Sequence, residues 1–233
     1  PDWALRDICG YMKVKPEQVK IHVALLGGAF GRKAYHDFLL EACHISKEMK
    51  KPVKVIWTRE DDITQGPYRP GMMSSMEGFV EEGKIVGFHH HAIGESILGQ
   101  VFKGLPDDEP DAWIGEELGT ANNNYNFAKA SKISWTRVKT EIPIVWWRSV
   151  YASNFGWGQE CFIDELAHLA GKDPLQARLD LLKDPRFVKV LETLAEKSEW
   201  NKKLPAGQGR GLAVFKSFGS ISATCITVTK KDA

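Results

Sequence analysis

The sequence predicts a mixed α+β fold, and two patterns in it carry that prediction. Short runs in which apolar and polar residues alternate, as in half-buried strands, occur near residues 19–25, 53–57 and 75–96. Other stretches repeat apolar residues at helical spacing, and two of them begin at an Asp-Pro pair. With 233 residues, 43% of them hydrophobic, the chain can build one substantial core or two modest ones.

The first part, residues 1–145, is expected to contain, in order, a helix at 1–12, a strand at 19–25, a glycine loop, a helix at about 35–49, a strand at 53–57 and a hairpin at 75–96. The two strands and the helix between them make this part βαβ-like. The hairpin should turn at Glu82-Gly83. Residues 99–126 are acidic and contain Pro and Asn, which indicates an irregular surface excursion, and a strand is expected near 131–143.

The second part, residues 146–233, is expected to be rich in helices. Phe162, Leu166 and Leu169 recur at helical spacing until Gly171, which can end that helix. Asp173-Pro174 and Asp184-Pro185 should cap two further helices, the second reaching about Trp200. From Leu204 the chain returns to strands. We therefore expect a helical stretch followed by the start of a strand region.

Composition excludes several classes of protein. The 31 basic and 30 acidic residues balance, and no long basic block is present, so no nucleic-acid partner is expected. No run approaches the roughly 18 apolar residues of a spanning helix. The four cysteines are far apart in apolar patterns, which indicates buried free thiols, at Cys9, Cys43, Cys161 and Cys225.

Both ends of the sequence have the pattern expected of a segment cut from a longer chain. The chain opens within a predicted helix, and the apolar alternation at Ile226 and Val228 runs into a charged turn that should lead to a partner strand. We therefore expect a segment of a larger protein. No targeting signal is legible, so periplasmic and cytoplasmic locations in a bacterium both stay open, as does membrane association of the full-length protein.

The stretch "GGAFGRK" at residues 27–33 places three glycines and a phenylalanine between a predicted strand and a predicted helix. In one interpretation this is a tight turn, in which Gly27, Gly28 and Gly31 supply positive φ angles. In the other, a ligand approaches the bare backbone at the helix N-terminus. The stretch matches neither common nucleotide-binding pattern, and Phe30 is unusual in a phosphate cradle.

Five motifs in a fixed order favour the ligand interpretation. Through these motifs the chain resembles the molybdopterin-binding large subunit of the xanthine dehydrogenase and aldehyde oxidoreductase family. Its isoquinoline-oxidising members are the most similar. The motifs are "GGAFGRK" at 27–33, "PVKVIWTREDD" at 52–62, "WRS" at 147–149, "FIDELAHLAGKDP" at 162–174, and "LPAGQGRG" at 204–211 with "SFGS" at 217–220. Their order and spacing cover nearly the whole chain.

The resemblance implies that two segments contact the molybdenum cofactor. The glycine loop would bring its backbone close to the metal side, with Phe30 lining the pocket, and Arg148 would donate hydrogen bonds to oxygen-rich cofactor groups. The alternative for Arg148 is a surface or interface salt bridge. The candidate cofactor-binding residues are Gly27, Gly28, Ala29, Phe30, Gly31, Trp147, Arg148 and Ser149.

The chain departs from the family pattern in two respects. Ala29 stands where the family commonly has a third glycine, so the loop must accept a Cβ. The family's catalytic glutamate and its oxo-contacting glutamine lie in motifs that this sequence does not contain. No catalytic residue and no metal ligand is therefore assigned within the 233 residues.

Other polar clusters have simpler explanations. On a strand His89 and His91 share one face and His90 the other, so packing or solvation is favoured over metal binding. The charged run from Arg59 to Asp62 could hold a site, but it is more typical of a turn that ends a strand. Glu81-Glu82 should be solvated at the hairpin tip, and Asp164-Glu165 should face solvent or a neighbouring subunit.

The resemblance implies part of a molybdenum hydroxylase that oxidises an aldehyde or an N-heterocyclic aromatic compound, with water as the oxygen source. Since the cysteines lack cluster spacing, electrons should leave through a small partner subunit that carries [2Fe–2S] clusters. The isolated segment is expected to fold without retaining molybdopterin and to be inactive. The alternative functions are a non-catalytic interaction or scaffold domain and, more remotely, a phosphate-ligand module.

Overall fold

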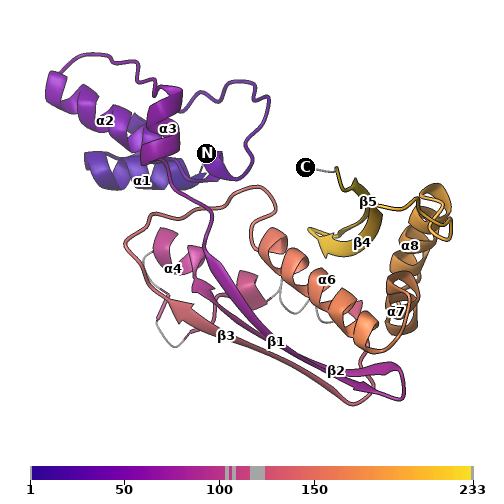
Figure 1. The fold of residues 1–233 in the computed structure, drawn as a ribbon. Coiled ribbons are helices and arrows are strands. Elements are labelled where there is room, and N and C mark those ends of the chain that lie inside the picture. Colours follow the sequence, from indigo (N-terminus) through magenta and orange to yellow (C-terminus); the bar gives the residue numbers. More distant parts are fainter. Residues whose placement is uncertain (1, 103–104, 107–108, 116–123, 232–233) are drawn as a thin grey trace. The chain divides into compact units, whose positions relative to one another are not determined.

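The computed structural model describes residues 2–102, 105–106, 109–115 and 124–231, and the chain divides into two compact units (Figure 1). Unit 1 consists of Pro1–Arg69 and Glu141–Arg148, and unit 2 of Pro70–Thr140 and Ser149–Ala233. The α+β class is confirmed. The division of the cofactor-binding region at 145/146 stays a prediction.

Unit 1 is built from short helices and connecting segments. The helices are α1 (Asp2–Met12), α2 (Asp37–Met49) and α3 (Arg59–Gln65), with single 3-10 turns at Pro16–Gln18 and Arg32–Ala34. The predicted helices at 1–12 and 35–49 are thereby confirmed. α1 packs on α2, and His36 Nε2 lies 2.8 Å from Asp7 Oδ2 between them. Burial by itself raises the pKa of Asp7, but the hydrogen bonds and the electrostatic attraction of Arg6 and His36 together hold it below its usual value.

The two strands predicted for unit 1 are not formed. Residues 19–26 and 52–57 lie outside any helix or strand, so the βαβ-like arrangement is wrong for the part of unit 1 that the structure describes. The alternation itself persists at 53–57, where Val53, Val55 and Trp57 are half-buried and Lys54 and Ile56 are exposed. These segments have the side-chain pattern of strands without a strand partner.

Helix α3 was not predicted, because the charged run at 59–62 was interpreted as a turn. Thr58 Oγ1 accepts a hydrogen bond from Asp61 N at 3.1 Å, and Asp61 Oδ2 accepts one from Thr58 N at 3.0 Å. This reciprocal capping box starts a helix rather than a turn. Arg59 and Asp62 are thus one turn apart on a helix.

Unit 2 contains a three-stranded sheet in the order β1-β2-β3, formed by Met72–Glu81, Lys84–Glu95 and Ala130–Val138. β1 and β2 are the predicted hairpin, and Glu82 and Gly83 have the positive φ angles of its tight turn. β3, also predicted, pairs with β2 in parallel. The stretch at 99–126 lies partly outside the described residues, and its first residues belong to α4 (Ile97–Val101).

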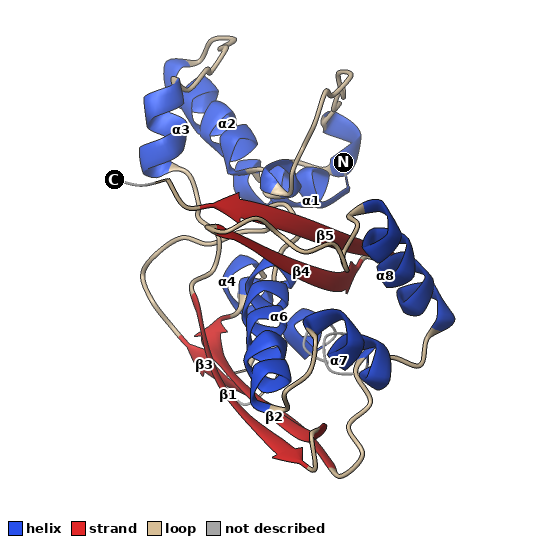
Figure 2. Cartoon of the chain, turned by 45° about the vertical axis from the view of Figure 1, so that its right-hand side comes forward, coloured by secondary structure: helices blue, strands red, loops and turns tan. Residues whose placement is uncertain are grey.

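Three helices and a second hairpin complete unit 2: α6 (Ala152–Leu169), α7 (Pro174–Leu181), α8 (Pro185–Lys197), β4 (Gln208–Ser217) and β5 (Ser220–Thr229). The predicted caps are confirmed, since Asp173 and Asp184 both accept main-chain hydrogen bonds. α6 starts well before the predicted stripe, and α8 ends before Trp200. Figure 2 shows α6 between the three-stranded sheet and the β4–β5 hairpin, both of which it contacts.

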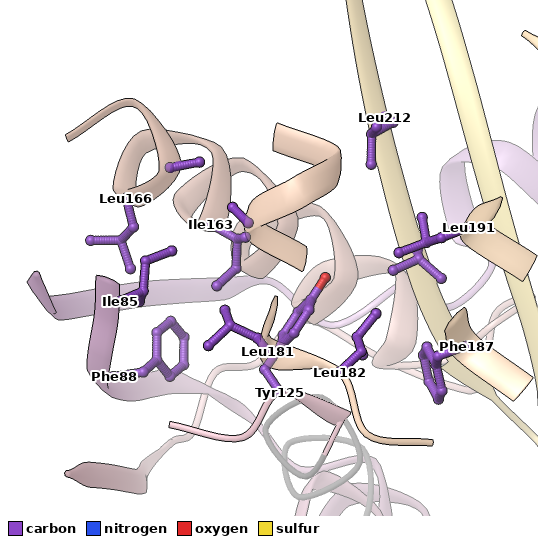
Figure 3. Close-up of a cluster of buried hydrophobic side chains, with 13 residues drawn as sticks. Ile85, Phe88, Tyr125, Ile163, Leu166, Leu181, Leu182, Phe187, Leu191 and Leu212 are labelled. Carbon is purple, nitrogen blue, oxygen red and sulfur yellow. The ribbon is translucent and has the colours of Figure 1, made fainter. Parts of the chain in front are cut away.

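The core of unit 2 gathers side chains from the sheet, the helices and the second hairpin (Figure 3). Phe88 from β2, Ile163 from α6 and Leu191 from α8 are each at most 1% exposed. The stripe of α6 includes Leu166, but Leu169 is 68% exposed. Burial on this scale stabilises unit 2 through removal of apolar area from water.

The expectation for the cysteines is confirmed only in part. The cysteines are free as predicted, but none is fully buried, and Cys161 is exposed, because it lies on the outer side of α6. Within the described residues, no group of three or more His, Cys, Asp or Glu side chains could hold a metal ion. No described helix has the length and apolarity that crossing a membrane requires.

Candidate functional site

The glycine loop of unit 1 turns at two consecutive residues with positive φ, Phe30 at +51° and Gly31 at +85°. A Cβ on Gly31 would lie 2.4 Å from the carbonyl oxygen of Trp146, so only glycine permits this approach. Two segments far apart in sequence therefore meet at Gly31. Ala29 has no positive φ, which explains how the loop accepts its Cβ.

Gly27 and Gly28 do not fit the turn interpretation, because neither has a positive φ. A Cβ on Gly28 would lie 2.6 Å from Cε2 of the Phe30 ring, which folds back over the loop. Around Gly27 a Cβ would meet no described atom within 4 Å. Gly28 thus leaves room for an aromatic ring, and Gly31 makes the turn.

The loop does not open directly into a helix, contrary to the expectation from sequence. A single 3-10 turn at Arg32–Ala34 follows it, and α2 begins only at Asp37. The Arg32 guanidinium bridges this junction, donating to Asp37 Oδ1 at 2.7 Å, to Asp37 Oδ2 at 3.1 Å and to Tyr35 O at 3.1 Å. The N-terminus of α2 is therefore not the group that faces the glycines.

The segment that meets the loop is anchored to residue 68. Tyr68 N donates to Pro143 O at 2.8 Å, and Val145 N donates to Tyr68 O at 3.0 Å. Ile144, Val145 and Trp146 are buried, whereas Trp147 is 51% exposed. The chain thus leaves a buried anchor and presents Trp147 and Arg148 at the surface of unit 1.

Two arginines and two aromatic rings interleave at that surface. The Arg148 guanidinium lies 5.5 Å from the centre of the Phe30 ring, and that of Arg69 lies 5.8 Å from the Trp147 ring. Arg69 Nη2 also donates to Arg148 O at 2.9 Å. Burial lowers the pKa of Arg69 from its usual value. Cation–π contacts of this kind fix the orientation of both partners.

Phe30, Trp147 and Arg148 line a cavity of about 520 Å³ in unit 1. Its walls come from the glycine loop, α3 and the 145–148 segment, and they carry three guanidinium groups, of Arg32, Arg59 and Arg148, against one carboxylate, of Asp62. Arg32 Nε is buried and makes no hydrogen bond to the described residues, and it lies 4.0 Å from Asp62 Oδ1. The cavity has the donor chemistry of a site for an oxygen-rich anion.

The structure brings together some of the predicted site residues. Ala29, Phe30, Trp147 and Arg148 line this cavity. Gly28 and Gly31 shape the loop, whereas Gly27 has open space around it. Ser149 belongs to unit 2, where it has a φ of +66°.

Three polar lining residues, Arg32, Arg59 and Asp62, are not among the predicted site residues, and the site that the run at 59–62 could hold was set aside in favour of a turn. The signal for the last two was the pattern Thr58-x-x-Asp61, which starts α3 and turns both side chains to the cavity. For Arg32 the sequence offered only its place next to the loop.

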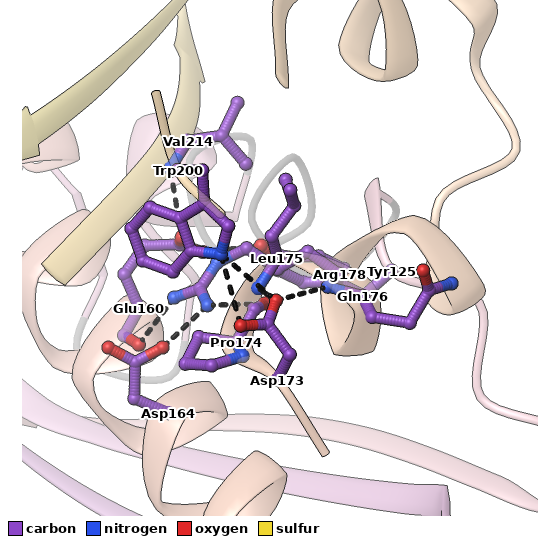
Figure 4. Close-up of polar contacts among 10 residues, drawn as sticks. All are labelled: Tyr125, Glu160, Asp164, Asp173, Pro174, Leu175, Gln176, Arg178, Trp200 and Val214. Atoms are coloured by element: carbon purple, nitrogen blue, oxygen red, sulfur yellow. Dashed lines mark hydrogen bonds and ion pairs between the residues drawn. The ribbon is translucent and has the colours of Figure 1, made fainter. Parts of the chain in front are cut away.

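A second polar cluster, in unit 2, was also missed (Figure 4). The fully buried Arg178 binds Glu160 Oε2 at 2.9 Å and Asp164 Oδ1 at 2.5 Å, and Glu160 also accepts from Tyr125 OH and Val214 N. Burial raises the pKa of Glu160 from its usual value despite Arg178. Since the polar groups of this cluster bind one another, it joins α6, α7 and β4 rather than binding a ligand.

Comparison with known proteins identifies a family for most of the chain. Residues 1–181 match the family described as the molybdopterin cofactor-binding domain. Isoquinoline 1-oxidoreductase subunit beta of Brevundimonas diminuta is 29% identical over 88% of this chain. The aldehyde oxidoreductase molybdenum-binding subunit PaoC of Escherichia coli K12 is 28% identical over 87% of it.

A solved structure has a similar fold. Quinoline 2-oxidoreductase from Pseudomonas putida 86 aligns with a TM-score of 0.69 and 17% identity, over 92% of this chain and 30% of that one. The present chain likewise spans 26% of the isoquinoline enzyme's subunit and 28% of PaoC. It therefore corresponds to between a quarter and a third of these proteins.

Proposed function

The chain belongs to the molybdopterin cofactor-binding domain family, and from this we propose that it forms one wall of the cofactor site in a molybdenum hydroxylase. The substrate class that we propose is an aldehyde or an N-heterocyclic aromatic compound, with water as the oxygen source. Relatives named for isoquinoline and for aldehydes support this class.

The observation that carries the proposal is the meeting of the glycine loop with Trp147 and Arg148 around one cavity. These residues are more than a hundred positions apart in the sequence, yet Gly31 packs on Trp146 and Arg148 on Phe30. Each contact needs a particular residue type: a glycine, an aromatic ring and a guanidinium. Packing alone rarely imposes three such requirements on an exposed loop.

The lining residues fit an anionic, oxygen-rich cofactor. Arg32, Arg59 and Arg148 can donate to phosphate and other anionic oxygens, and the buried Nε of Arg32 is a donor that the described protein groups leave unused. The Phe30 and Trp147 rings supply apolar surface to the same cavity. When bound, the molybdenum cofactor supplies the redox chemistry, while these residues hold and orient it.

The same residues set a limit on what the chain does by itself. A large anionic cofactor needs contacts from several sides, and the described residues offer one wall. The family's catalytic glutamate has no counterpart in this sequence, and general-base assistance is worth about 10²–10⁴ in rate. The isolated chain is therefore expected neither to retain the cofactor nor to turn over substrate.

The experiment is to replace Arg148 by Ala in the native protein and to measure bound molybdenum and pterin. Arg6→Ala is the control, because Arg6 lies outside the cavity in the same unit, with its side chain 65% exposed. We expect Arg148→Ala to lose most of its pterin while its circular dichroism stays unchanged, and Arg6→Ala to retain it. Unaltered cofactor content in Arg148→Ala would exclude the assigned contact.

The non-catalytic scaffold makes a different prediction for the unaltered protein. It requires that the native protein contain neither molybdenum nor pterin, whatever residue occupies position 148. Stoichiometric molybdenum in the native protein would instead exclude the scaffold.

We also propose a small partner subunit with [2Fe–2S] clusters, because the oxidation releases two electrons and the free cysteines here are dispersed. Relatives that carry the word "subunit" in their names support an assembly of several chains. Iron analysis of the purified native complex tests this proposal, and a complex without iron would contradict it.

A further inference from the structure

Arg69 contacts two residues of the candidate site without lining its cavity. Its guanidinium donates from Nη2 to Arg148 O at 2.9 Å and lies 5.8 Å from the centre of the Trp147 ring. Trp147 and Arg148 line the cavity of about 520 Å³, whereas Arg69 is not among its lining residues. Arg69 therefore holds the wall of the site rather than facing a ligand in it.

The Arg148 side chain has to be held in one direction if it is to meet an anion efficiently. It is exposed, and an arginine has many rotamers that a ligand would otherwise have to restrict on binding. Its guanidinium lies 5.5 Å from the centre of the Phe30 ring, which orients the end of the side chain. The direction in which the side chain starts depends instead on the main chain at residue 148.

That main chain leads into a turn that few residues adopt. Ser149 has a φ of +66° and Val150 a φ of +46°, and a positive φ is a genuine outlier for a β-branched residue. In this conformation the Cβ crowds the carbonyl oxygen of the preceding residue. For Ser149 that oxygen is Arg148 O, the atom to which Arg69 donates. Since strained conformations persist where surrounding contacts over-determine them, the hydrogen bond from Arg69 is a contact that this turn needs.

The residue before Arg69 anchors the same segment by other means. Tyr68 N donates to Pro143 O at 2.8 Å, and Val145 N donates to Tyr68 O at 3.0 Å. Both are main-chain hydrogen bonds, which a substitution of the Arg69 side chain leaves in place. The anchor thus fixes the course of residues 143–145, and the Arg69 side chain acts farther along, at residues 147 and 148.

We propose that Arg69 is a positioning residue, which fixes the peptide after Arg148 and thereby directs the Arg148 guanidinium over Phe30 at the cavity. A guanidinium suits this role, because its planar fork can donate to a carbonyl oxygen while its face lies on an aromatic ring such as that of Trp147. That the directed group then meets the cofactor rests on the proposed function. The link from Arg69 through Arg148 to Phe30 does not, because it concerns contacts within unit 1 alone.

Fluorine NMR of para-fluorophenylalanine at position 30 tests this link, in the native polypeptide prepared from cells that make no molybdopterin. Because the Arg148 charge lies over this ring, Arg148→Ala should shift the resonance. Arg69→Met should shift it in the same direction, Arg69→Lys by less because it keeps a donor, and the matched control Arg6→Met, outside the cavity, not at all. In the Arg148→Ala background, Arg69→Met should cause no further shift. An unshifted resonance in Arg69→Met or Arg148→Ala would overturn the proposal, as would an effect of Arg69→Met that persists without Arg148.

Exchange of the Val145 amide shows whether Arg69→Met leaves the anchor intact. We expect unchanged exchange, because this amide donates to the main-chain oxygen of Tyr68. Faster exchange would mean that Arg69 maintains the fold of the whole segment, and it would overturn the positioning role.

Release of pterin from the loaded native protein tests what Arg148 is directed at. Arg69→Met should release pterin about tenfold faster than the unaltered protein, or retain none, since a hydrogen bond from a charged donor contributes about that factor to an equilibrium constant. Arg69→Lys should lie between the two, and Arg6→Met should match the unaltered protein. Unchanged release in Arg69→Met with faster release in Arg148→Ala would overturn the inference and leave the proposed function intact. A native protein that binds no pterin would contradict the proposed function alone, because the fluorine resonance tests the link without the cofactor.

Discussion

Arg178 Nε and Glu160 Oε2 lie 2.9 Å apart inside unit 2, where the arginine side chain is fully buried and the glutamate is 5% exposed. Burial alone would lower the pKa of Arg178, but the negative charges of Glu160 and Asp164 together with Tyr125 raise it above its usual value. The pair also connects two helices to a strand, because Glu160 accepts from Val214 N at 2.9 Å.

Arg178→Met should therefore destabilise unit 2 strongly. Removing one partner of a buried pair leaves the other charge without compensation, which costs about 3–5 kcal/mol. Asp164→Asn is the control, since Asp164 binds the same arginine but is 39% exposed and should cost less than about 1 kcal/mol. Urea unfolding followed by circular dichroism measures both. Similar losses in the two variants would contradict the assignment.

His90 should make stability depend on pH. Its ring is fully buried, and burial, with a smaller effect of His89 and His91, lowers its pKa to about 4. In the unfolded chain the ring takes up its proton near pH 6.5. Stability contributed by neutral His90 is thus complete above pH 6.5 and is lost as pH falls towards 4, by at most about 3 kcal/mol.

The measurement is the free energy of unfolding between pH 7 and 4.5. His90→Phe keeps a ring of similar size beside Phe88 and Phe155 and should flatten the pH dependence, whatever its effect on stability at pH 7. His89→Asn, at a partly exposed position, should keep the slope of the unaltered protein. Equal slopes in all three proteins would contradict the role of His90.

Gly31→Ala should separate the glycine loop from the segment at 141–148. The new Cβ would clash with Trp146 O at 2.4 Å, and a positive φ costs a non-glycine residue about 1–3 kcal/mol. Exchange of the Val145 amide, which donates to Tyr68 O at 3.0 Å, should become faster. Gly27→Ala in the same loop has open space around it and should leave this exchange unchanged. Unaltered Val145 exchange in Gly31→Ala would show that the contact is dispensable.

Strand β5 should promote self-association of the 1–233 chain. It pairs with β4 alone among the described strands, and Ile226 and Val228 on its outer face are each 61% exposed. Ile226→Lys should lower the average mass in sedimentation experiments at high concentration. Ser222→Lys, on the same face, adds the same charge without removing apolar surface and should have a smaller effect. The reverse order would argue against association through this face.

The elements that could be predicted from sequence are those with local causes. Asp173 and Asp184 cap their helices through hydrogen bonds to residues two positions away, and the hairpin turn uses only Glu82 and Gly83. Such signals are complete within a few residues. The capping box of Thr58 and Asp61 was equally local, and it was missed because the charges around it suggested a turn.

Other features depend on residues that are distant in sequence. Nothing near Glu160 predicts that Arg178 will bind it, and nothing near Gly31 predicts the Trp146 carbonyl. The alternation at 53–57 did predict the pattern of burial, but forming a strand also requires a partner. For the candidate site, the residues indicated two unusual segments, and only the family resemblance placed them together.

Unit 1 is formed by two separate stretches of the sequence, and this affects the order in which the protein can fold during synthesis. Arg69 and Arg148, which share a hydrogen bond, are separated by 79 positions, most of which belong to unit 2. At about 5–20 residues per second, a ribosome needs roughly 4–16 s to make that stretch. Throughout this interval the glycine loop has emerged without its opposite wall. Assembly of the candidate site is therefore a late event, and it follows the synthesis of the sheet in unit 2.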